Sequence, residues 1–338
     1  MVLSVEVNAD GTPFVAIGQY QFRLEVEELY GEYKKMAENE LQETPQRVSD
    51  GLNRLRDLIK AEDDLYLPVD DDRFLIKFLR PFRFNPEHGF KVMRRFYLFK
   101  TKYPKYGGNG VTPHAVRHVF DNEVFVFLPT RSKTGGRIMI INCGKKWDPK
   151  LVKLEDMFRS IMVAIEIAML EPKTQVGGVN VILNMEGLGL HHVYQFSPSM
   201  AKLIIDWVQE CAPVRLRGLH VVNQPFVFNV LFAIFKPFLG EYIKKRLSFH
   251  GSDRPSLAEK IGREGLPEKY GGTADIPDYP GSLFSDMLFY YEEEFRVHNT
   301  YGYGTTTTAR PIYTYEDDPK ENELESGEEG EKIKTRAW

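Results

Sequence analysis

The amino-acid sequence predicts an α/β fold in which a small all-helical N-terminal domain precedes a mostly parallel β-sheet flanked by helices. Three observations support this prediction. Apolar residues recur at helical spacing between residues 44 and 108, and short apolar strands alternate with helices after residue 123. The stretch 154–170 leaves almost no polar face, which is typical of a helix that is covered nearly all round or lines an apolar cavity.

The same patterns divide the chain into segments. An N-terminal extension covers residues 1–43, the helical domain covers residues 44–108, and the sheet domain covers residues 109–275. A C-terminal helix is expected within residues 276–298. Residues 299–338 are poor in apolar side chains and rich in like charge, so we expect an acidic, disordered tail.

The N-terminal third contains signals for one strand and several helices. We expect a short strand at residues 14–17 and a charged helical stretch around residues 25–35. Thr44 suits the N-cap of an amphipathic helix that follows it. The acidic residues 70–72 open a second helix, and apolar residues between 90 and 97 mark a third.

The sheet domain is predicted from apolar strands separated by helices. The turn sequence TRSKTGGR between the first two strands predicts a hairpin, whereas the later helical connections imply parallel pairing. The expected strands cover residues 124–128, 137–142, 179–184, 219–223 and 247–250. The expected helices cover residues 154–170, 198–211, 225–238, 256–262 and, after the sheet, 282–297.

The sequence lacks the motifs of common enzyme classes. It contains no phosphate-binding loop, no serine nucleophile elbow and no H-E-x-x-H helix. The adjacent His191 and His192 lack a third ligand at a suitable spacing, so we interpret them as loop or surface histidines. Cys143 and Cys211 are too few for a disulfide framework, and we expect two buried, hydrophobic side chains. We therefore expect no catalysis, no cofactor and no metal.

The formal net charge of −4 hides an uneven distribution. Residues 316–338 contain nine acidic and four basic residues, a net of −5, and the other 39 acidic and 40 basic residues give +1. This balance does not support a nucleic-acid partner. Residues 213–246 nevertheless contain six basic residues against Glu241, a net of +5, and include the aromatic-rich helix expected at 225–238. The combination suits docking on an anionic lipid surface, although composition alone favours a core helix with a solvated basic end.

The sequence also indicates where the protein resides. The N-terminus shows no secretory pattern, and the longest strongly apolar run, residues 227–235, is far shorter than the roughly 20 residues of a membrane-spanning helix. Two cysteines in a chain of this length fit a reducing compartment. We therefore expect a cytoplasmic monomer that contacts membranes only transiently and peripherally.

Five sequence blocks resemble the CRAL-TRIO (Sec14-like) lipid-binding family, on the branch of the alpha-tocopherol transfer protein and the cellular retinaldehyde-binding protein. Each block is short, but all five occur in the order of the family and together span about residues 44–275. The blocks are DDDRFLIKFLRPFRFNPEHG, GKKWDPK, VNVILNMEGLGLHHVYQFSP, APVRLRGLHVVNQPFVFNVLFAIFKPFLGEYIKKRLSFHG and LPEKYGG.

The resemblance implies a hydrophobic lipid pocket between the sheet and its helices, closed by a mobile gate helix. The gate would be residues 225–238, with a hinge that continues to Arg246. Ile161 and Ile165 stand at positions that are serine in the tocopherol carriers, which removes hydroxyl partners for a chromanol. The pocket residues expected from this resemblance are Ile161, Met162, Ile165, Met169, Leu183, Trp207, Val208, Phe228, Leu231, Phe232 and Phe235.

The same branch implies a basic cleft that binds phosphoinositide head groups. Tyr242 stands where lysine is common in the family, although lysines follow within one turn. The cleft residues expected from the resemblance are Arg215, Arg217, Lys244 and Arg246, with contributions from Arg80 and Arg83.

The sequence thus predicts a non-enzymatic carrier of one hydrophobic lipid, such as a tocopherol, a retinoid or a similar isoprenoid, which exchanges its ligand at phosphoinositide-containing membranes. An alternative is a lipid-sensing adaptor that recruits a protein partner without bulk transfer. A third and less favoured hypothesis is an enzyme that uses Glu166 as an acid or base within the pocket, because a buried carboxylate more often has a structural partner.

Overall fold

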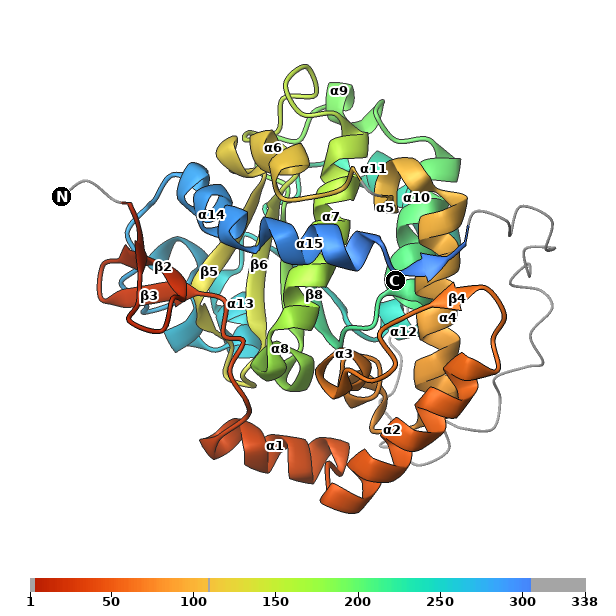
Figure 1. Ribbon diagram of the computed structural model, residues 1–338. Coiled ribbons are helices and arrows are strands. Elements are labelled where there is room, and N and C mark those ends of the chain that lie inside the picture. The colour runs from red at the N-terminus through yellow and green to blue at the C-terminus, as the bar shows by residue number, and fades with distance from the viewer. Residues whose placement is uncertain (1–3, 109, 305–338) are drawn as a thin grey trace, which may run out of the picture. The chain divides into compact units, whose positions relative to one another are not determined.

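A five-stranded sheet forms the centre of the computed structural model, which describes residues 4–108 and 110–304 (Figure 1). The strands follow one another in the order β5-β6-β7-β8-β9; β5 is antiparallel to β6, and the other neighbours are parallel. The predicted hairpin and the mostly parallel sheet are therefore confirmed. The strand bounds are Phe125–Arg131 (β5), Arg137–Asn142 (β6), Val179–Asn184 (β7), Leu216–Val222 (β8) and Leu247–Gly251 (β9).

The sheet is apolar on both faces, and alternate residues of each strand point to opposite sides. In β6, Ile138 and Ile140 face a cluster that includes Leu257 and Ile261 of helix α13. Met139 and Ile141 face the other side, where α7 lies. Each strand therefore presents one row of side chains to α13 and another row to α7.

Helices connect the strands and cover both faces. The predicted limits of α7 match the structure, and Pro172 follows its last residue by two positions, where the helix cannot continue unbroken. A π-helical turn at Trp207–Cys211 completes the helix expected at 198–211. The helices of this region are α6 (Arg117–Asp121), α7 (Leu154–Leu170), α8 (Pro172–Gly177), α9 (Leu190–Val193), α10 (Pro198–Asp206), α11 (Phe228–Phe235), α12 (Glu241–Lys244) and α13 (Arg254–Ile261).

The three helices predicted for residues 44–108 are present, and the first begins at the predicted N-cap, Thr44. The Thr44 hydroxyl accepts a hydrogen bond of 3.3 Å from the backbone N–H of Arg47, and the Asn85 side chain accepts one of 2.9 Å from that of His88. The second helix is short and continues into a 3₁₀ turn. The helices here are α2 (Pro45–Lys60), α3 (Asp72–Ile76), α4 (Pro86–Lys102) and α5 (Pro104–Gly107).

The N-terminal extension contains more structure than the sequence predicted. The expected strand at 14–17 is the middle one of three, and the expected helix begins later than predicted, at Gly31. Residues 24–30 form neither helix nor strand, and the backbone N–H of Glu25 donates a 3.0 Å hydrogen bond to buried Glu171. These elements are β1 (Val5–Val7), β2 (Pro13–Ile17), β3 (Tyr20–Arg23) and α1 (Gly31–Leu41).

The C-terminal helix predicted at 282–297 is two helices joined by a 3₁₀ turn, α14 (Gly281–Leu288) and α15 (Glu292–Asn299). In Figure 1 α15 crosses in front of α7. Beyond them, β10 (Gly302–Tyr303) pairs with β4 (Leu65–Tyr66). Asn299 to Tyr303 are thus part of the fold, whereas the rest of the acidic tail, residues 305–338, lies outside the described residues.

The domain boundary expected near residue 108 is crossed by a shared hydrophobic core. The rings of Phe99 and Trp207 lie 4.6 Å apart, and those of Tyr106 and Phe158 lie 4.8 Å apart. One compact unit extends up to Tyr303. In the described part of the chain, no helix is long and apolar enough to cross a membrane.

Two histidines, buried His220 and partly buried His298, should make the fold sensitive to acid. Burial, together with the nearby His250, lowers the pKa of His220 to about 4, and burial beside Lys77 lowers that of His298 to about 4. Unfolded histidine titrates near pH 6.5, so the unfolded state binds more protons between pH 6.5 and 4. Stability is complete above that window and falls within it by up to about 3 kcal/mol per histidine.

Urea unfolding at pH 7.5 and pH 5 measures this loss. His220→Gln should flatten the pH dependence, whereas the same change at exposed His191 should leave it unaltered. An unchanged slope for His220→Gln would remove His220 as a cause of acid sensitivity.

Candidate functional site

An apolar cavity of about 260 Å³ lies between the sheet, α7, α10 and α11. The strands line it with every second residue, for example Met139 and Ile141 of β6. The helices contribute one face each, including Ile161 and Ile165 from α7. Further lining residues are Phe125, Phe127, Met157, Phe158, Ala164, Ala168, Val181, Leu183, Ile204, Ile205, Val208, Leu219, Val221, Phe228, Leu231, Phe232 and Phe235.

The structure gathers eight of the predicted pocket residues around this one cavity. They come from four separate elements, which shows that the fold brings distant positions together. These residues are Ile161, Ile165, Leu183, Val208, Phe228, Leu231, Phe232 and Phe235.

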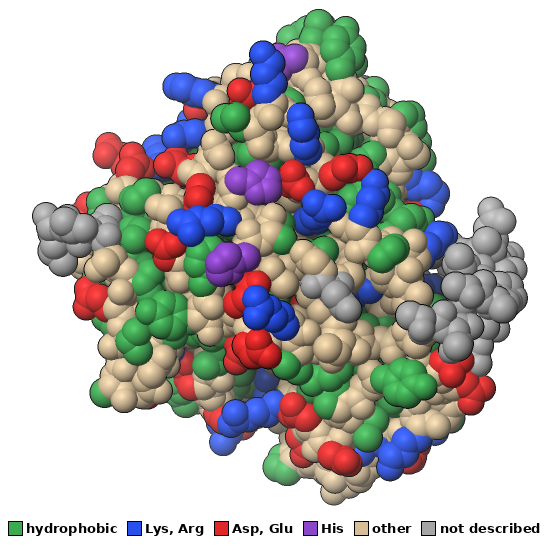
Figure 2. Space-filling view, turned by 45° about the horizontal axis from the view of Figure 1, so that its top comes forward, with side chains coloured by type: hydrophobic (Ala, Val, Ile, Leu, Met, Phe, Trp, Pro, Cys, Tyr) green, Lys and Arg blue, Asp and Glu red, His purple; other side chains and the backbone are tan. Residues whose placement is uncertain are grey.

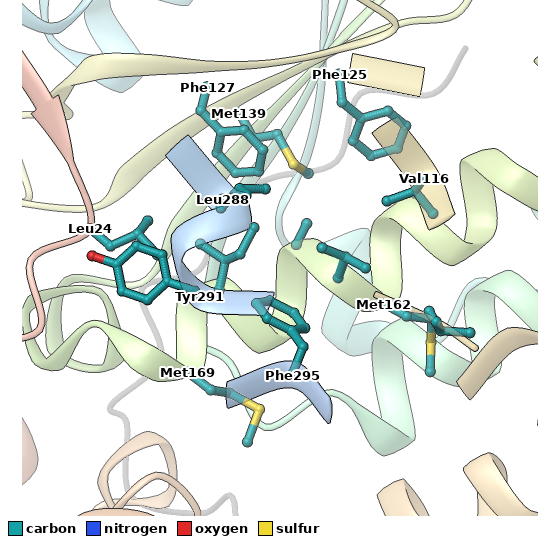
Figure 3. Close-up of a cluster of buried hydrophobic side chains, with 14 of the residues drawn as sticks. Leu24, Val116, Phe125, Phe127, Met139, Met162, Met169, Leu288, Tyr291 and Phe295 are labelled. Carbon is teal, nitrogen blue, oxygen red and sulfur yellow. The ribbon is translucent and has the colours of Figure 1, made fainter. Parts of the chain in front are cut away.

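The other three predicted pocket residues lie outside the cavity. Met162 and Met169 belong to the core on the opposite side of α7, in a cluster that contains Leu288, Tyr291 and Phe295 of the C-terminal helices (Figure 3). The Trp207 ring lies 5.3 Å from that of Phe96, in the helical layer. The sequence could not separate the two sides of α7, because both are apolar.

Sequence analysis missed the contribution of the first two strands, Phe125 and Phe127 of β5 and Met139 and Ile141 of β6. Period-two alternation could have found them once one face of the sheet was assigned to the cavity. Two charged lining residues, Arg137 and Glu171, were also missed.

Helix α11 is apolar on both sides. Its inner side chains Phe228, Leu231 and Phe232 line the cavity, whereas Val230 is half exposed on the outside. Phe226, just before the helix, is 89% exposed. The helix therefore forms a thin wall between the cavity and the surface.

Arg137 and Glu171 form an ion pair at one end of the cavity, where β6 begins and α7 ends. Burial alone would raise the pKa of Glu171, but Arg137 and Arg131 outweigh it and hold the pKa at about 2. Glu171 is therefore ionised at neutral pH. This end of the cavity is polar, in contrast to its remaining walls.

The structure brings Arg215 and Arg217 together around one carboxylate of the N-terminal extension. Glu40 Oε2 accepts hydrogen bonds of 2.8 Å from Arg215 Nη2 and 2.7 Å from Arg217 Nη2. Arg83 lies close enough to Arg215 to lower its pKa, although burial of Arg215 is the larger cause. We call Arg83, Arg215 and Arg217 the basic cluster.

The other predicted cleft residues have different surroundings. Arg80 is buried and donates hydrogen bonds of 2.6 and 2.8 Å to Glu43, which gives it a structural role. The Arg246 guanidinium stacks 3.8 Å from the ring of Tyr242. Exposed Lys244 forms an ion pair of 3.0 Å with Glu241. On the face shown in Figure 2, acidic and basic side chains are interspersed.

Glu166 is not among the residues that line the cavity, so the geometry does not support the hypothesis of an enzyme that uses it there. Its carboxylate lies on the far side of α7, where Oε1 accepts a 3.1 Å hydrogen bond from Lys100 Nζ. The same ammonium group donates a 3.0 Å hydrogen bond to Asn299 Oδ1. Glu166 therefore joins the N-terminal and C-terminal helices to α7, as its structural interpretation required.

The side chains of His192 and Cys143 are buried or hydrogen-bonded within the fold. His192 is buried, in contrast to the surface interpretation: Nδ1 accepts a 2.9 Å hydrogen bond from the N–H of Gly189, and Nε2 lies 2.8 Å from the carbonyl of Trp147. Burial raises the pKa of the Cys143 thiol to about 12. Among the described residues, no group of three or more side chains is arranged to hold a metal ion.

The sequence and the structure of this chain are similar to those of known proteins. Residues 121–272 match the model of the CRAL/TRIO domain. The human protein "Alpha-tocopherol transfer protein-like" is 32% identical over 77% of this chain and 75% of its own length. Clavesin-1 of Xenopus laevis is 27% identical over 83% and 85% of the two chains. The crystal structure of Sfh5 covers 76% of this chain and 97% of its own at 14% identity, with a TM-score of 0.40.

Proposed function

Since the chain belongs to the CRAL/TRIO family of lipid-binding and transfer proteins, we propose that it carries one hydrophobic lipid in its cavity and exchanges it at phosphoinositide-containing membranes. The observation that carries this proposal is the cavity itself, which is lined almost entirely by apolar side chains. The ligand would be a tocopherol, a retinoid or a similar isoprenoid.

The free energy of apolar burial is sufficient for such a carrier. At about 25 cal/mol per Å² of apolar surface, a C20 to C30 lipid gains on the order of 10 kcal/mol before the cost of immobilisation. Such tight retention requires a trigger for release.

Helix α11 is the proposed gate. Its inner rings line the cavity, and the outer Phe226 and Val230 are exposed beside it. Movement of α11 in water would expose the inner rings at a cost, whereas on a membrane these rings would meet lipid. Membrane contact would therefore favour the open gate.

The basic cluster is the proposed phosphoinositide site. Arg215 and Arg217 now share Glu40, whose side chain is 39% exposed. A phosphate group presents more acceptors and more charge than one carboxylate, so it would replace Glu40 between the two guanidinium groups.

Filling part of the cavity should weaken lipid uptake without unfolding the protein. Ala168→Phe places a ring among the lining residues, and overpacking of about 1–3 kcal/mol would weaken binding about tenfold or more. Ala115→Phe, at an exposed position that does not line the cavity, is the matched control. Native mass spectrometry, lipid extraction and titration with fluorescent retinoid, tocopherol and phospholipid probes measure the uptake. If wild-type protein yields no lipid and binds none of the probes, it is not a lipid carrier.

Removing the charge of Glu40 should strengthen binding to phosphoinositide vesicles. Glu40→Gln frees both arginines from a competing anion, and a gain of about 1 kcal/mol corresponds to about fivefold tighter binding, which high salt should reduce. Exposed Glu38 on the same helix provides the control Glu38→Gln. Vesicle sedimentation at two salt concentrations measures the effect. If Glu40→Gln and Arg217→Ala both leave the affinity unchanged and insensitive to salt, the basic cluster is not the head-group site.

A further inference from the structure

Arg137 and Glu171 are the charged members of a cavity lining that is otherwise apolar in the described part of the chain. Arg137 is the first residue of β6, and strand alternation places it on the same face as Met139 and Ile141. Glu171 directly follows α7. Both therefore lie at the end of the cavity where these two elements meet.

The hydrogen bonds of Glu171 are already complete within the protein. Oε1 accepts hydrogen bonds from Arg137 Nη2 and, at 3.0 Å, from the N–H of Glu25. Oε2 accepts one of 3.1 Å from Arg137 Nε and one of 2.7 Å from the Thr174 hydroxyl. Glu171 thus orients Arg137 and has little capacity left for a ligand.

Arg137, in contrast, has one guanidinium nitrogen that these hydrogen bonds do not use. Nε and Nη2 bond to Glu171, and Nη2 also donates a 3.3 Å hydrogen bond to the carbonyl of Arg23. Its third nitrogen, Nη1, takes part in none of these hydrogen bonds, and Arg137 lines the cavity. An oxygen of a ligand in the cavity would therefore find a charged donor at Nη1.

The guanidinium group is held rigidly and is not fully neutralised. Its carbon lies 5.5 Å from the ring of Phe22, and Glu171 fixes its plane through two nitrogens. Arg131 and Lys173 also belong to this ion cluster, through contacts of 2.6 and 2.5 Å to Glu25. Lys173 also lies 3.5 Å from Glu27, which forms a 2.8 Å ion pair with Arg23, so four cations and three carboxylates leave an excess positive charge at this end of the cavity.

We infer that Arg137 is the polar anchor of the cavity and donates a hydrogen bond from Nη1 to one oxygen at the end of an otherwise apolar ligand. The expected ligands are therefore long alcohols, aldehydes, ketones or carboxylates, and pure hydrocarbons are expected to bind more weakly. This inference rests on the proposed carrier function. The apolar body of the ligand lies along β6 toward Cys143, six residues or about 20 Å away.

A matched pair of ligands tests the anchor. Phytanol and phytane have the same branched chain, and only phytanol has a terminal hydroxyl. Each is offered to the protein from neutral phosphatidylcholine vesicles, and the bound fraction is extracted and quantified. Because a hydrogen bond to a charged group is worth a factor of about 10 to 100, wild-type protein should prefer phytanol by at least about tenfold after correction for vesicle partitioning.

The variant Arg137→Met with Glu171→Leu removes both partners together, so that neither charge is left unpaired. It should bind phytane at least as well as the wild type and lose the preference for phytanol. Ile138→Val, on the opposite face of the same strand, should keep the preference. Circular dichroism establishes that each variant is folded.

A second measurement needs no variant. The aldehyde analogue of phytanol, bound to wild-type protein, should show its carbonyl infrared stretch at a lower frequency than in the vesicles, since the oxygen accepts a charged hydrogen bond. Equal uptake of phytanol and phytane, or a carbonyl stretch that does not shift, would overturn the anchor while leaving the carrier proposal intact. If the wild type takes up none of these ligands but binds the retinoid or tocopherol probes, the anchor fails as well; if it binds none of the ligands and none of the probes, the carrier proposal itself fails.

Discussion

The fold depends on the burial of α7 on two opposite sides. Ile161 and Ile165 face the cavity and the sheet, whereas Met162 and Met169 face the helical layers. A helix that is apolar all round cannot expose either side to water, so the sheet alone is not a sufficient partner. The N-terminal and C-terminal helices complete its burial, and the contacts of Lys100 join both to α7. The chain on either side of the sheet domain is therefore part of the same core.

This two-sided burial explains which predictions from the sequence succeeded. Regular periodicity predicted the exact limits of α7 and β7. The apolar pattern of α7 is long, and β7 is a mostly apolar strand, so each pattern indicates its secondary structure without knowledge of the tertiary contacts. Periodicity could not tell which apolar side faces a cavity, so Met162 was misplaced. The three-stranded N-terminal sheet was largely missed, since its short strands depend on tertiary contacts such as the stacking of Phe22 on Phe284 at 5.5 Å.

The charges show a different limit of sequence analysis. A local excess of basic residues in 213–246 was evident, but the partners of those residues were not. Glu40 lies 175 residues before Arg215, and no local count connects the two. The same holds for Arg137, whose partner Glu171 is recognisable only when β6 and the end of α7 lie side by side. Long-range ion pairs leave no periodic signal, so the polar end of the cavity required the structure.

The basic cluster and the polar end of the cavity are connected through one short helix. Arg215 donates to the carbonyl of Val176, and Arg217 donates a 2.9 Å hydrogen bond to that of Gly177, both in the last turn of α8. Cations at this end of a helix satisfy carbonyls that have no partner within it. Thr174 in the same helix bonds to Glu171, which orients Arg137. A group that displaces Glu40 therefore contacts the two arginines that bind the end of α8. Thr174 of α8 in turn bonds to Glu171, and Glu171 and Arg137 are the charged residues described in the cavity lining.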